Sequence, residues 1–316
     1  MATRPATLRT TDVVAQTLRG RKLSPGGLVF EIALLLALLV SLLFLVTLLV
    51  DVFVSGWGVI TGRGWEFVNS PLSLTPTSAG VWQSIMGSVV LTLFVAVLAF
   101  PAGIGAAIYL EEYAPDNRIT RFINTNIRNL AGVPSIVYGI LGFTIFVRFV
   151  SAIGAGGDVN GKNIIAGGLT LAALVLPIVI ITSAEALRAV PTSIREAGFG
   201  VGATRWEVIR SHVLPSAAPG ILTGTVLTLA RAFGETAPLL LVGAATGFFS
   251  LGANAGIADR IIGPYTALPV TIFSWTRQPD AEFRALTAAA IIVLLVVLLT
   301  ANATAIIMRN RYERKW

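Results

Sequence analysis

Six long apolar stretches constrain the fold of this chain more than any other feature of its sequence. They cover residues 28–54, 82–110, 130–153, 164–184, 217–249 and 286–308. A helix needs about 20 mostly apolar residues to cross the hydrocarbon core of a bilayer, which is about 30 Å thick, because each residue adds about 1.5 Å. The sequence therefore predicts an all-α, polytopic membrane protein with six transmembrane helices.

The composition supports the same fold class. Of the 316 residues, 55% are hydrophobic and 12% are charged, which is about half the charged share of a soluble domain. The first stretch is longer than the apolar core of a signal peptide, which has about 7–15 residues, and no small-residue cleavage site follows it. We expect this stretch to be retained as a transmembrane helix, with a cleaved signal as the alternative.

The Lys and Arg residues outside the spans are unequally divided between the two sides of the membrane. Sixteen belong to the N-terminal tail, the loops after the second and fourth spans, and the C-terminal tail, whereas five belong to the other loops. Because basic loops stay in the cytoplasm, both termini are predicted to be cytoplasmic, with tails at 1–27 and 309–316. This distribution accounts for the net charge of +7 without a nucleic-acid partner.

Several kinds of chemistry are excluded by residue types that the chain lacks. It has no cysteine and one histidine, so it cannot form a thiolate or His-rich metal site. No set of nucleophile and base is visible, and we expect no catalytic residues, no metal and no cofactor bound by this chain. The phosphate-binding motif G-x-x-x-x-G-K-[ST] is also absent, so any ATP has to be bound by a separate partner.

The loop at residues 191–215, between the fourth and fifth spans, carries signals for two short helices. Ser193 stands three residues before Glu196, and Thr204 stands three residues before Glu207. Each pair forms a capping box, in which the two side chains satisfy free N–H groups at a helix start. The sequence therefore predicts two helix starts within this cytoplasmic loop.

Glycines between the two predicted starts favour a break, and they are Gly198, Gly200 and Gly202. On the second helix, Trp206, Ile209 and Val213 are predicted to share one face. A structured apolar and basic hairpin exposed to the cytoplasm is typical of a docking surface. Packing of the hairpin back onto its own helices is the alternative.

Two charged residues, Arg231 and Glu235, lie inside the fifth stretch. Arg231 follows Pro219 by twelve residues, which places it about 18 Å from the cytoplasmic edge of a helix. The spacing of four puts both side chains on one helix face. A charge at the bilayer centre costs about 2.5–3.5 kcal/mol, which favours a functional role for the pair. A structural ion pair is the alternative.

The pair suits an anion that carries its own hydrogen-bond donor. The guanidinium of Arg231 presents a planar fork that matches phosphate oxygens. Hydrogen phosphate has an O–H group that Glu235 can accept, whereas sulfate at neutral pH has none. Glu235 can also neutralise Arg231 between substrates, and the sequence does not choose between these roles.

Three further features of the sequence also carry predictions. Glu111 and Glu112 end the second stretch and are expected to form a solvated helix cap. The loop at 250–281 is expected to contain a short re-entrant or interfacial segment near 267–273. Prolines inside the stretches are read as kinks or hinges, and they are Pro101, Pro134, Pro177 and Pro238.

The loop at 191–215 resembles the conserved coupling loop of ABC-importer permeases, which reads Glu-Ala-Ala, then Gly, then Ile-x-Leu-Pro at fixed spacing. This chain has Glu196-Ala197-Gly198, Gly202 and His212-Val213-Leu214-Pro215 at that spacing. Gly198 replaces the second Ala, and His212 replaces Ile. In the family this loop fits into a groove on a separate ATPase subunit. The resemblance therefore implies ATPase contacts for Glu196, Ala197, Gly198, Gly202, Ala203, Trp206, Leu214 and Pro215. We call residues 191–215 the coupling loop.

Four other segments, at residues 131–139, 185–191, 230–238 and 267–275, resemble signatures of phosphate ABC-importer permeases. The resemblance covers the chain from residue 82 to its end, and the A-type branch of these permeases is the most similar. The C-type branch shares several of the segments and remains an alternative. Under this resemblance Arg231 and Glu235 align with charged positions implicated in transport, and Arg188 is a second candidate for the substrate pathway.

The resemblance implies a type I importer fold, with a five-helix permease core at 82–308 after the first helix at 28–54. It implies a multi-pass subunit of the bacterial inner membrane that forms half of the pathway of an ATP-driven importer of inorganic phosphate. The implied partners are a second, C-type permease, an ATPase dimer, an extracytoplasmic phosphate-binding protein and the lipid bilayer. Alternatives are a permease for another anion and an ion-coupled secondary transporter that uses the Arg231–Glu235 pair.

Overall fold

The computed structural model describes residues 25–244 and 261–312, and these residues form helices with no β-strand among them. Six of the helices are long and apolar enough to cross a membrane. This confirms the prediction of an all-α fold with six candidate spans. Of the predicted tails at 1–27 and 309–316, residues 1–24 and 313–316 lie outside the described residues, whereas 25–27 and 309–312 belong to helices. Residues 245–249 of the predicted fifth span and the first part of the loop at 250–281 also lie outside the described residues.

The contacts between residues divide the chain into two units, residues 1–51 and 52–316. The first helix spans the boundary between these two units. In chain order the elements are α2 (Pro25–Asn69), α3 (Trp82–Ile108), the π-turn η1 (Tyr109–Tyr113), α4 (Arg118–Ala131), α5 (Ser135–Leu141), the π-turn η2 (Gly142–Val147), α6 (Arg148–Ala152), the 3-10 turn η3 (Gly157–Val159), α7 (Ile164–Arg188), α8 (Thr192–Gly200), α9 (Arg205–Val208), the π-turn η4 (Ile209–Val213), α10 (Leu214–Gly234), α11 (Ala237–Val242), α13 (Leu268–Thr276) and α14 (Glu282–Tyr312).

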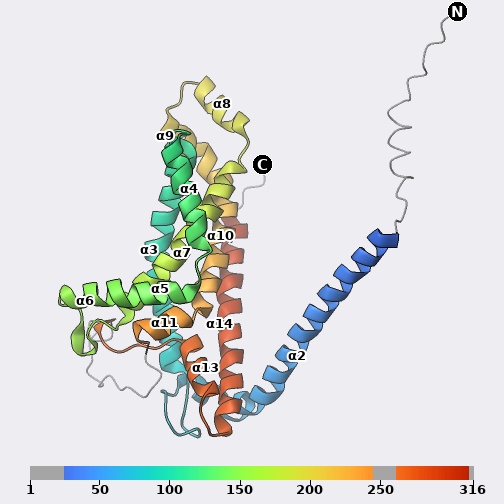
Figure 1. Cartoon of the computed structure of the whole chain (residues 1–316), viewed down its shortest axis with the longest axis vertical. Helices are drawn as coiled ribbons and strands as arrows, with labels where there is room; N and C mark the ends of the chain where they lie inside the picture. Colours follow the sequence, from blue (N-terminus) through green and yellow to red (C-terminus); the bar gives the residue numbers. More distant parts are fainter. Residues whose placement is uncertain (1–24, 245–260, 313–316) are drawn as a thin grey trace, which may run out of the picture. The chain divides into compact units, whose positions relative to one another are not determined.

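Helix α7 is the most buried candidate span, and it packs between α3 and α10 (Figure 1). Small residues let α3 and α7 approach closely. A Cβ added at Gly103 would lie 2.7 Å from Val179, and one added at Gly168 would lie 2.3 Å from Phe94. Close approach at small residues is how helices associate in lipid, where neighbouring acyl chains are as apolar as the side chains.

The first helix is longer than its predicted span at 28–54, because it continues to Asn69. The extra residues include four glycines and two charged side chains, so hydropathy alone ends the span too early. Tertiary packing keeps them helical. The ring of Phe67 is fully buried, with its centroid 6.3 Å from that of Trp275 in α13. A Cβ at Gly56 would lie 2.7 Å from the backbone of Ala289 in α14.

The third predicted span, 130–153, differs from the structure in its start and in its direction. Helix α4 ends at Ala131, and α5 begins at Ser135 after Pro134, which caps it. Pro134 is therefore a helix start and not a kink within a span, because its fixed φ suits that position. Figure 1 shows α5 and α6 crossing the direction of α3, α7 and α14. Pro101 and Pro177 lie inside α3 and α7, as predicted.

The predicted short segment near 267–273 is present as α13, and polar groups of α3 hold it. The backbone N–H of Leu268 donates to Ser88 Oγ at 2.8 Å, and the Ser84 and Thr271 hydroxyls lie 2.7 Å apart. Both hydrogen bonds are buried. Because unpaired polar groups are costly away from water, these bonds fix where α13 sits against α3.

Candidate functional site

The predicted pair Arg231 and Glu235 is brought together at the end of helix α10. Arg231 Nε lies 3.5 Å from Glu235 Oε1. The side chain of Arg231 is 55% exposed within this chain, whereas that of Glu235 is 15% exposed. The carboxylate is thus mostly enclosed by its own chain, while the guanidinium remains open to an anion or to a partner subunit.

The sequence predicted one continuous helix at 217–249, but Arg231 and Glu235 do not lie within a single helix. Helix α10 ends at Gly234, and Glu235 is extended, with ψ of 124°. A new short helix, α11, begins at Ala237. Pro238 explains the break, because it has no N–H to donate to the carbonyl of Gly234 four residues earlier. Pro238 therefore starts a helix instead of kinking one.

A broken helix inside a membrane protein leaves backbone groups free to contact a substrate. The break at residues 234–237 lies within the signature-like segment 230–238. Gly139 of α5 faces α11, and a Cβ there would lie 2.8 Å from the Pro238 Cα and 2.8 Å from Leu241. The segments at 131–139 and 230–238 therefore pack against each other. Helix α5 supports the short helix that follows the Arg231–Glu235 pair.

The coupling loop forms two helices, α8 and α9, as predicted, and two glycines determine their geometry. Gly202 has φ of +83°, a left-handed conformation that favours glycine. Gly198 is buried, and a Cβ there would lie 2.7 Å from Val208 Cγ2. Glycine in place of the family's second Ala therefore lets α8 approach α9 more closely.

One of the two predicted capping boxes is confirmed. The Thr204 side chain and Glu207 form the reciprocal bonds of a capping box at the start of α9. The box at Ser193 and Glu196 is wrong. Helix α8 begins at Thr192 after Pro191, so Ser193 lies inside the first turn and caps nothing.

The exposed side chains of the coupling loop include most of the predicted ATPase contacts. Glu196, Ala197, Gly202, Trp206 and Pro215 are exposed, while Ala203 and Leu214 are half-buried. The face predicted to include Trp206, Ile209 and Val213 is divided: Ile209 and Val213 are fully buried, whereas Trp206 is exposed. The π-turn η4 at 209–213 shifts the register that the sequence spacing assumed.

Two apolar residues of the coupling loop, Phe199 and Val201, were not among the ATPase contacts predicted from the sequence. Phe199 is 49% exposed and Val201 is 84% exposed, next to the turn between α8 and α9. Together with Trp206, at 53%, they give this turn an apolar outer surface. Apolar residues beside a glycine-rich turn are visible in the sequence, and they indicate an apolar surface that binds a partner.

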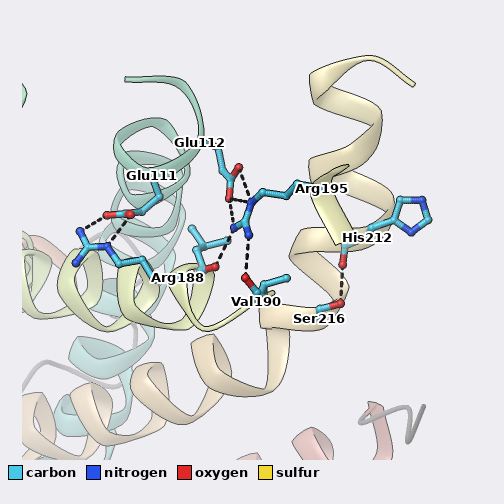
Figure 2. A network of polar contacts seen from close by, with 8 residues as sticks. Glu111, Glu112, Arg188, Val190, Arg195, His212 and Ser216 are labelled. Atoms are coloured by element: carbon cyan, nitrogen blue, oxygen red, sulfur yellow. Dashed lines mark hydrogen bonds and ion pairs between the residues drawn. The ribbon is translucent and has the colours of Figure 1, made fainter. Parts of the chain in front are cut away.

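The carboxylates at the end of α3 are paired and not a solvated cap, which corrects the prediction for them. Glu111 accepts from Arg188, with Nε 2.7 Å from Oε2, in a bidentate pair. Glu112, only 6% exposed, accepts from Arg195 of α8, with Nη2 2.6 Å from Oε1. Figure 2 shows the two pairs between α3, α7 and α8. The sequence did not single out Arg195, because its partner is 83 residues away.

Arg188, the second candidate for the substrate pathway, thus lies at the coupling-loop end of α7 and is held by Glu111. Its side chain is 47% exposed, so the guanidinium keeps a free face. The structure does not bring Arg188 into contact with Arg231 or Glu235 by any hydrogen bond or ion pair of the described residues. The described residues contain no cluster of three or more potential metal ligands.

Comparison with known proteins identifies the family. Residues 99–314 match the family model described as "binding-protein-dependent transport system inner membrane component". The phosphate transport system permease protein PstA 1 of Mycobacterium tuberculosis H37Rv is 35% identical over 85% of this chain and 83% of its own length. PstA of Yersinia pestis is 37% identical over 72% of this chain and 71% of its own length.

Other relatives and solved structures agree with this family. The probable ABC transporter permease protein YqgI of Bacillus subtilis is 30% identical over 75% of this chain and 81% of its own length. A methionine ABC transporter in an inward-facing conformation has a similar fold, with a TM-score of 0.53 and 18% identity, over 74% of this chain and 95% of its own. The fold is also similar to that of a bacterial ABC transporter involved in alginate import, with a TM-score of 0.51 and 14% identity. This match covers 87% of this chain and 96% of the transporter chain.

These likenesses confirm the type I importer fold and the inner-membrane location that the sequence predicted. A permease of this kind works with an ATPase partner and is embedded in the membrane through several spans. The chain belongs to the binding-protein-dependent transport system inner membrane components, as a PstA-like ABC permease.

Proposed function

We propose that this chain is the A-type permease subunit of an ATP-driven importer of inorganic phosphate in the bacterial inner membrane. The observation that carries the proposal is the Arg231–Glu235 pair, whose atoms lie 3.5 Å apart at a break in a membrane-crossing helix. Relatives named as phosphate permeases support the choice of substrate. The same relatives carry the A-type name, which supports A-type over the C-type alternative.

In this proposal Arg231 binds the phosphate oxygens as hydrogen phosphate passes. Its open guanidinium offers two parallel N–H donors to two oxygens of one anion. Glu235 accepts the O–H of hydrogen phosphate and repels the fully ionised oxygens of sulfate. Between substrates Glu235 neutralises Arg231, because an unpaired charge in the membrane is costly. Both roles need the 3.5 Å approach of the two side chains.

The coupling loop is proposed to dock on the ATPase through its exposed residues, with Glu196, Ala197 and Trp206 at the contact. This loop and both termini are assigned to the cytoplasm, because most Lys and Arg residues outside the spans flank that side. A second, C-type permease completes the pathway, and an extracytoplasmic phosphate-binding protein delivers the anion. ATP binds only to the ATPase, so this chain is a non-enzymatic subunit without a cofactor.

Arg188 is retained as a second pathway candidate near the coupling-loop end. Its guanidinium already contacts both oxygens of Glu111, so an anion would compete with that carboxylate. We expect Arg188 to contact phosphate only as the anion leaves. An ion-coupled secondary transporter, the other candidate function, has no use for a docking loop with the geometry of α8 and α9.

Uptake of labelled phosphate by cells that lack their own phosphate importers tests the proposed substrate. The chain is expressed with its permease, ATPase and binding-protein partners, and sulfate or molybdate is added in excess as competitor. We expect ATP-dependent phosphate uptake that neither competitor reduces. Assembly with the ATPase but no phosphate uptake would refute phosphate as the substrate and favour a permease for another anion. Uptake that persists without the ATPase would favour a secondary transporter.

A further inference from the structure

Arg195 of α8 makes more polar contacts than any other charged side chain of the coupling loop among the residues that the structure describes. Its Nη2 and Nε donate to the Glu112 carboxylate, with Nη2 2.6 Å and Nε 3.2 Å from Oε1. Nη1 donates to the carbonyl of Val190 at 2.9 Å, and Nη2 also donates to the carbonyl of Leu187 at 3.0 Å. All three guanidinium nitrogens are therefore engaged (Figure 2).

These contacts join α8 to the end of α7, which precedes it directly, and to the end of α3, whose Glu112 is 83 residues away in the sequence. Glu112 lies in η1, which follows α3 directly. Leu187 lies in the last turn of α7, and Val190 follows the end of that helix by two residues. Helix ends leave carbonyls without intrahelical partners, and a basic side chain there both caps them and complements the helix dipole. Arg195 thus caps α7 and binds the end of α3 while it belongs to the coupling helix α8.

Burial makes this junction different from an ordinary surface ion pair. The side chains of Arg195 and Glu112 are 20% and 8% exposed. If either one lost its partner, the other charge would be left largely out of water, which is strongly unfavourable. The junction is therefore made as a unit or not at all, as expected of a rigid connection.

We propose that the Arg195–Glu112 pair is a positioning pair that makes α8 move as one body with the ends of α3 and α7. Force applied to the coupling loop by the ATPase then reaches two membrane-crossing helices directly. Arg195 touches no substrate and acts through the helices that it connects. The inference rests on the proposed docking of the ATPase at this loop, and it does not depend on phosphate as the cargo.

Neutral variants of the pair test this inference in the reconstituted complex. Arg195→Gln and Glu112→Gln keep the side-chain volume and remove one charge each. We expect assembly with the ATPase and ATP hydrolysis to persist, while substrate transported per ATP falls about tenfold, a typical size for a lost coupling interaction. Unchanged transport per ATP in both variants would overturn the proposal.

The chain offers a matched control in Arg121 and Asp116. This pair is also a bidentate Arg–carboxylate contact, with Nε 2.9 Å from Oδ1, but its side chains are 71% and 80% exposed. The Arg121 hydrogen bonds lower the pKa of the Asp116 carboxyl, so this exposed pair is charged at neutral pH. Arg121→Gln should leave transport per ATP unchanged, and an equal loss there would point to a general charge effect.

A distance measurement tests the rigid connection even if a neutral variant fails to assemble. The natural chain contains no cysteine, so single spin labels can be placed without background. Gly105 in α3 and Gly200 in α8 are exposed, and a Cβ at either one meets nothing within 4 Å. Labels on Gly105→Cys and Gly200→Cys report whether α8 follows α3.

In the assembled complex, the label distance should stay the same with and without trapped ATP, because α8 and α3 move together. Arg195→Gln should broaden the distance distribution or make it depend on ATP. Arg195→Lys should give a distribution of intermediate width, since an ammonium cannot reach Glu112 and both carbonyls at once. A wild-type distance that changes on ATP binding would overturn the proposal. If the wild type transports no phosphate, this measurement still decides the coupling question.

Discussion

At the residue scale, glycines determine how closely the helices of the coupling loop approach. Gly198 is buried against Val208, whereas Gly200, two residues later in the same helix, is exposed and open. Both residues are glycines of α8, but only a Cβ at Gly198 would meet a neighbouring side chain. They therefore separate the effect of packing from the effect of helix propensity.

We predict that Gly198→Ala destabilises the coupling loop by about 1–3 kcal/mol, the usual cost of overpacking. The added methyl would lie 2.7 Å from Val208 Cγ2. Thermal unfolding of the purified complex measures this effect, and the double variant Gly198→Ala with Val208→Ala should recover part of the loss. Gly200→Ala should be neutral or slightly stabilising, since alanine favours a helix by about 0.5–1 kcal/mol over glycine. Equal effects at the two glycines would contradict the packing argument.

The carboxylate of Glu235 is expected to set the preference for phosphate over sulfate. We predict that Glu235→Gln makes sulfate an inhibitor of phosphate uptake, because the amide donates hydrogen bonds to sulfate oxygens that the carboxylate repels. The measurement is the inhibition curve for sulfate in cells that express the wild type or the variant. Glu235→Asp keeps the charge and is the control, for which sulfate should stay without effect. Inhibition by sulfate that is unaltered in Glu235→Gln would show that selectivity resides elsewhere.

At the scale of elements, the break between α10 and α11 has a local cause that is visible in the sequence, although the sequence analysis did not predict the break. Gly234 is a poor helix former, and Pro238 removes the N–H that would have bonded its carbonyl. The sequence interpretation weighed the apolar character of the segment more heavily and kept one helix to residue 249. The break places Arg231 in the last turn of α10 and Glu235 just beyond it.

We predict that Pro238→Ala, which restores the missing N–H, lets α10 continue and displaces Arg231 from Glu235. Transport should fall about 100-fold, as expected when a site group is misplaced by about 1 Å, while assembly with the ATPase is retained. Pro219→Ala is the control, because Pro219 lies inside α10 near its other end. Uptake assays on both variants decide the matter, and normal transport by Pro238→Ala would show that the break has no role in transport.

At the scale of the whole molecule, the six spans could be predicted because long apolar runs have few other outcomes. The coupling loop could be predicted because capping at Thr204 and the turn at Gly202 are local. Features that depend on distant contacts were missed. The Glu112–Arg195 junction and the helical continuation to Asn69 depend on partners far along the chain, such as Trp275 for Phe67. Neither hydropathy nor helix period carries information about such partners.

The proposed function depends on binding of the transported anion by Arg231 at the break in the fifth span. Labelled phosphate uptake into proteoliposomes that hold the full complex tests it most directly, with wild type, Arg231→Gln and Arg148→Gln compared at equal assembly. Arg148 is the matched control, since it is an exposed arginine in another candidate span, at the start of α6. We predict that Arg231→Gln loses about 30-fold or more in phosphate transport, as for a lost contact to a paired charge, and that Arg148→Gln stays near wild type. Transport by Arg231→Gln at the wild-type rate would contradict it and would leave Arg231 as a structural charge.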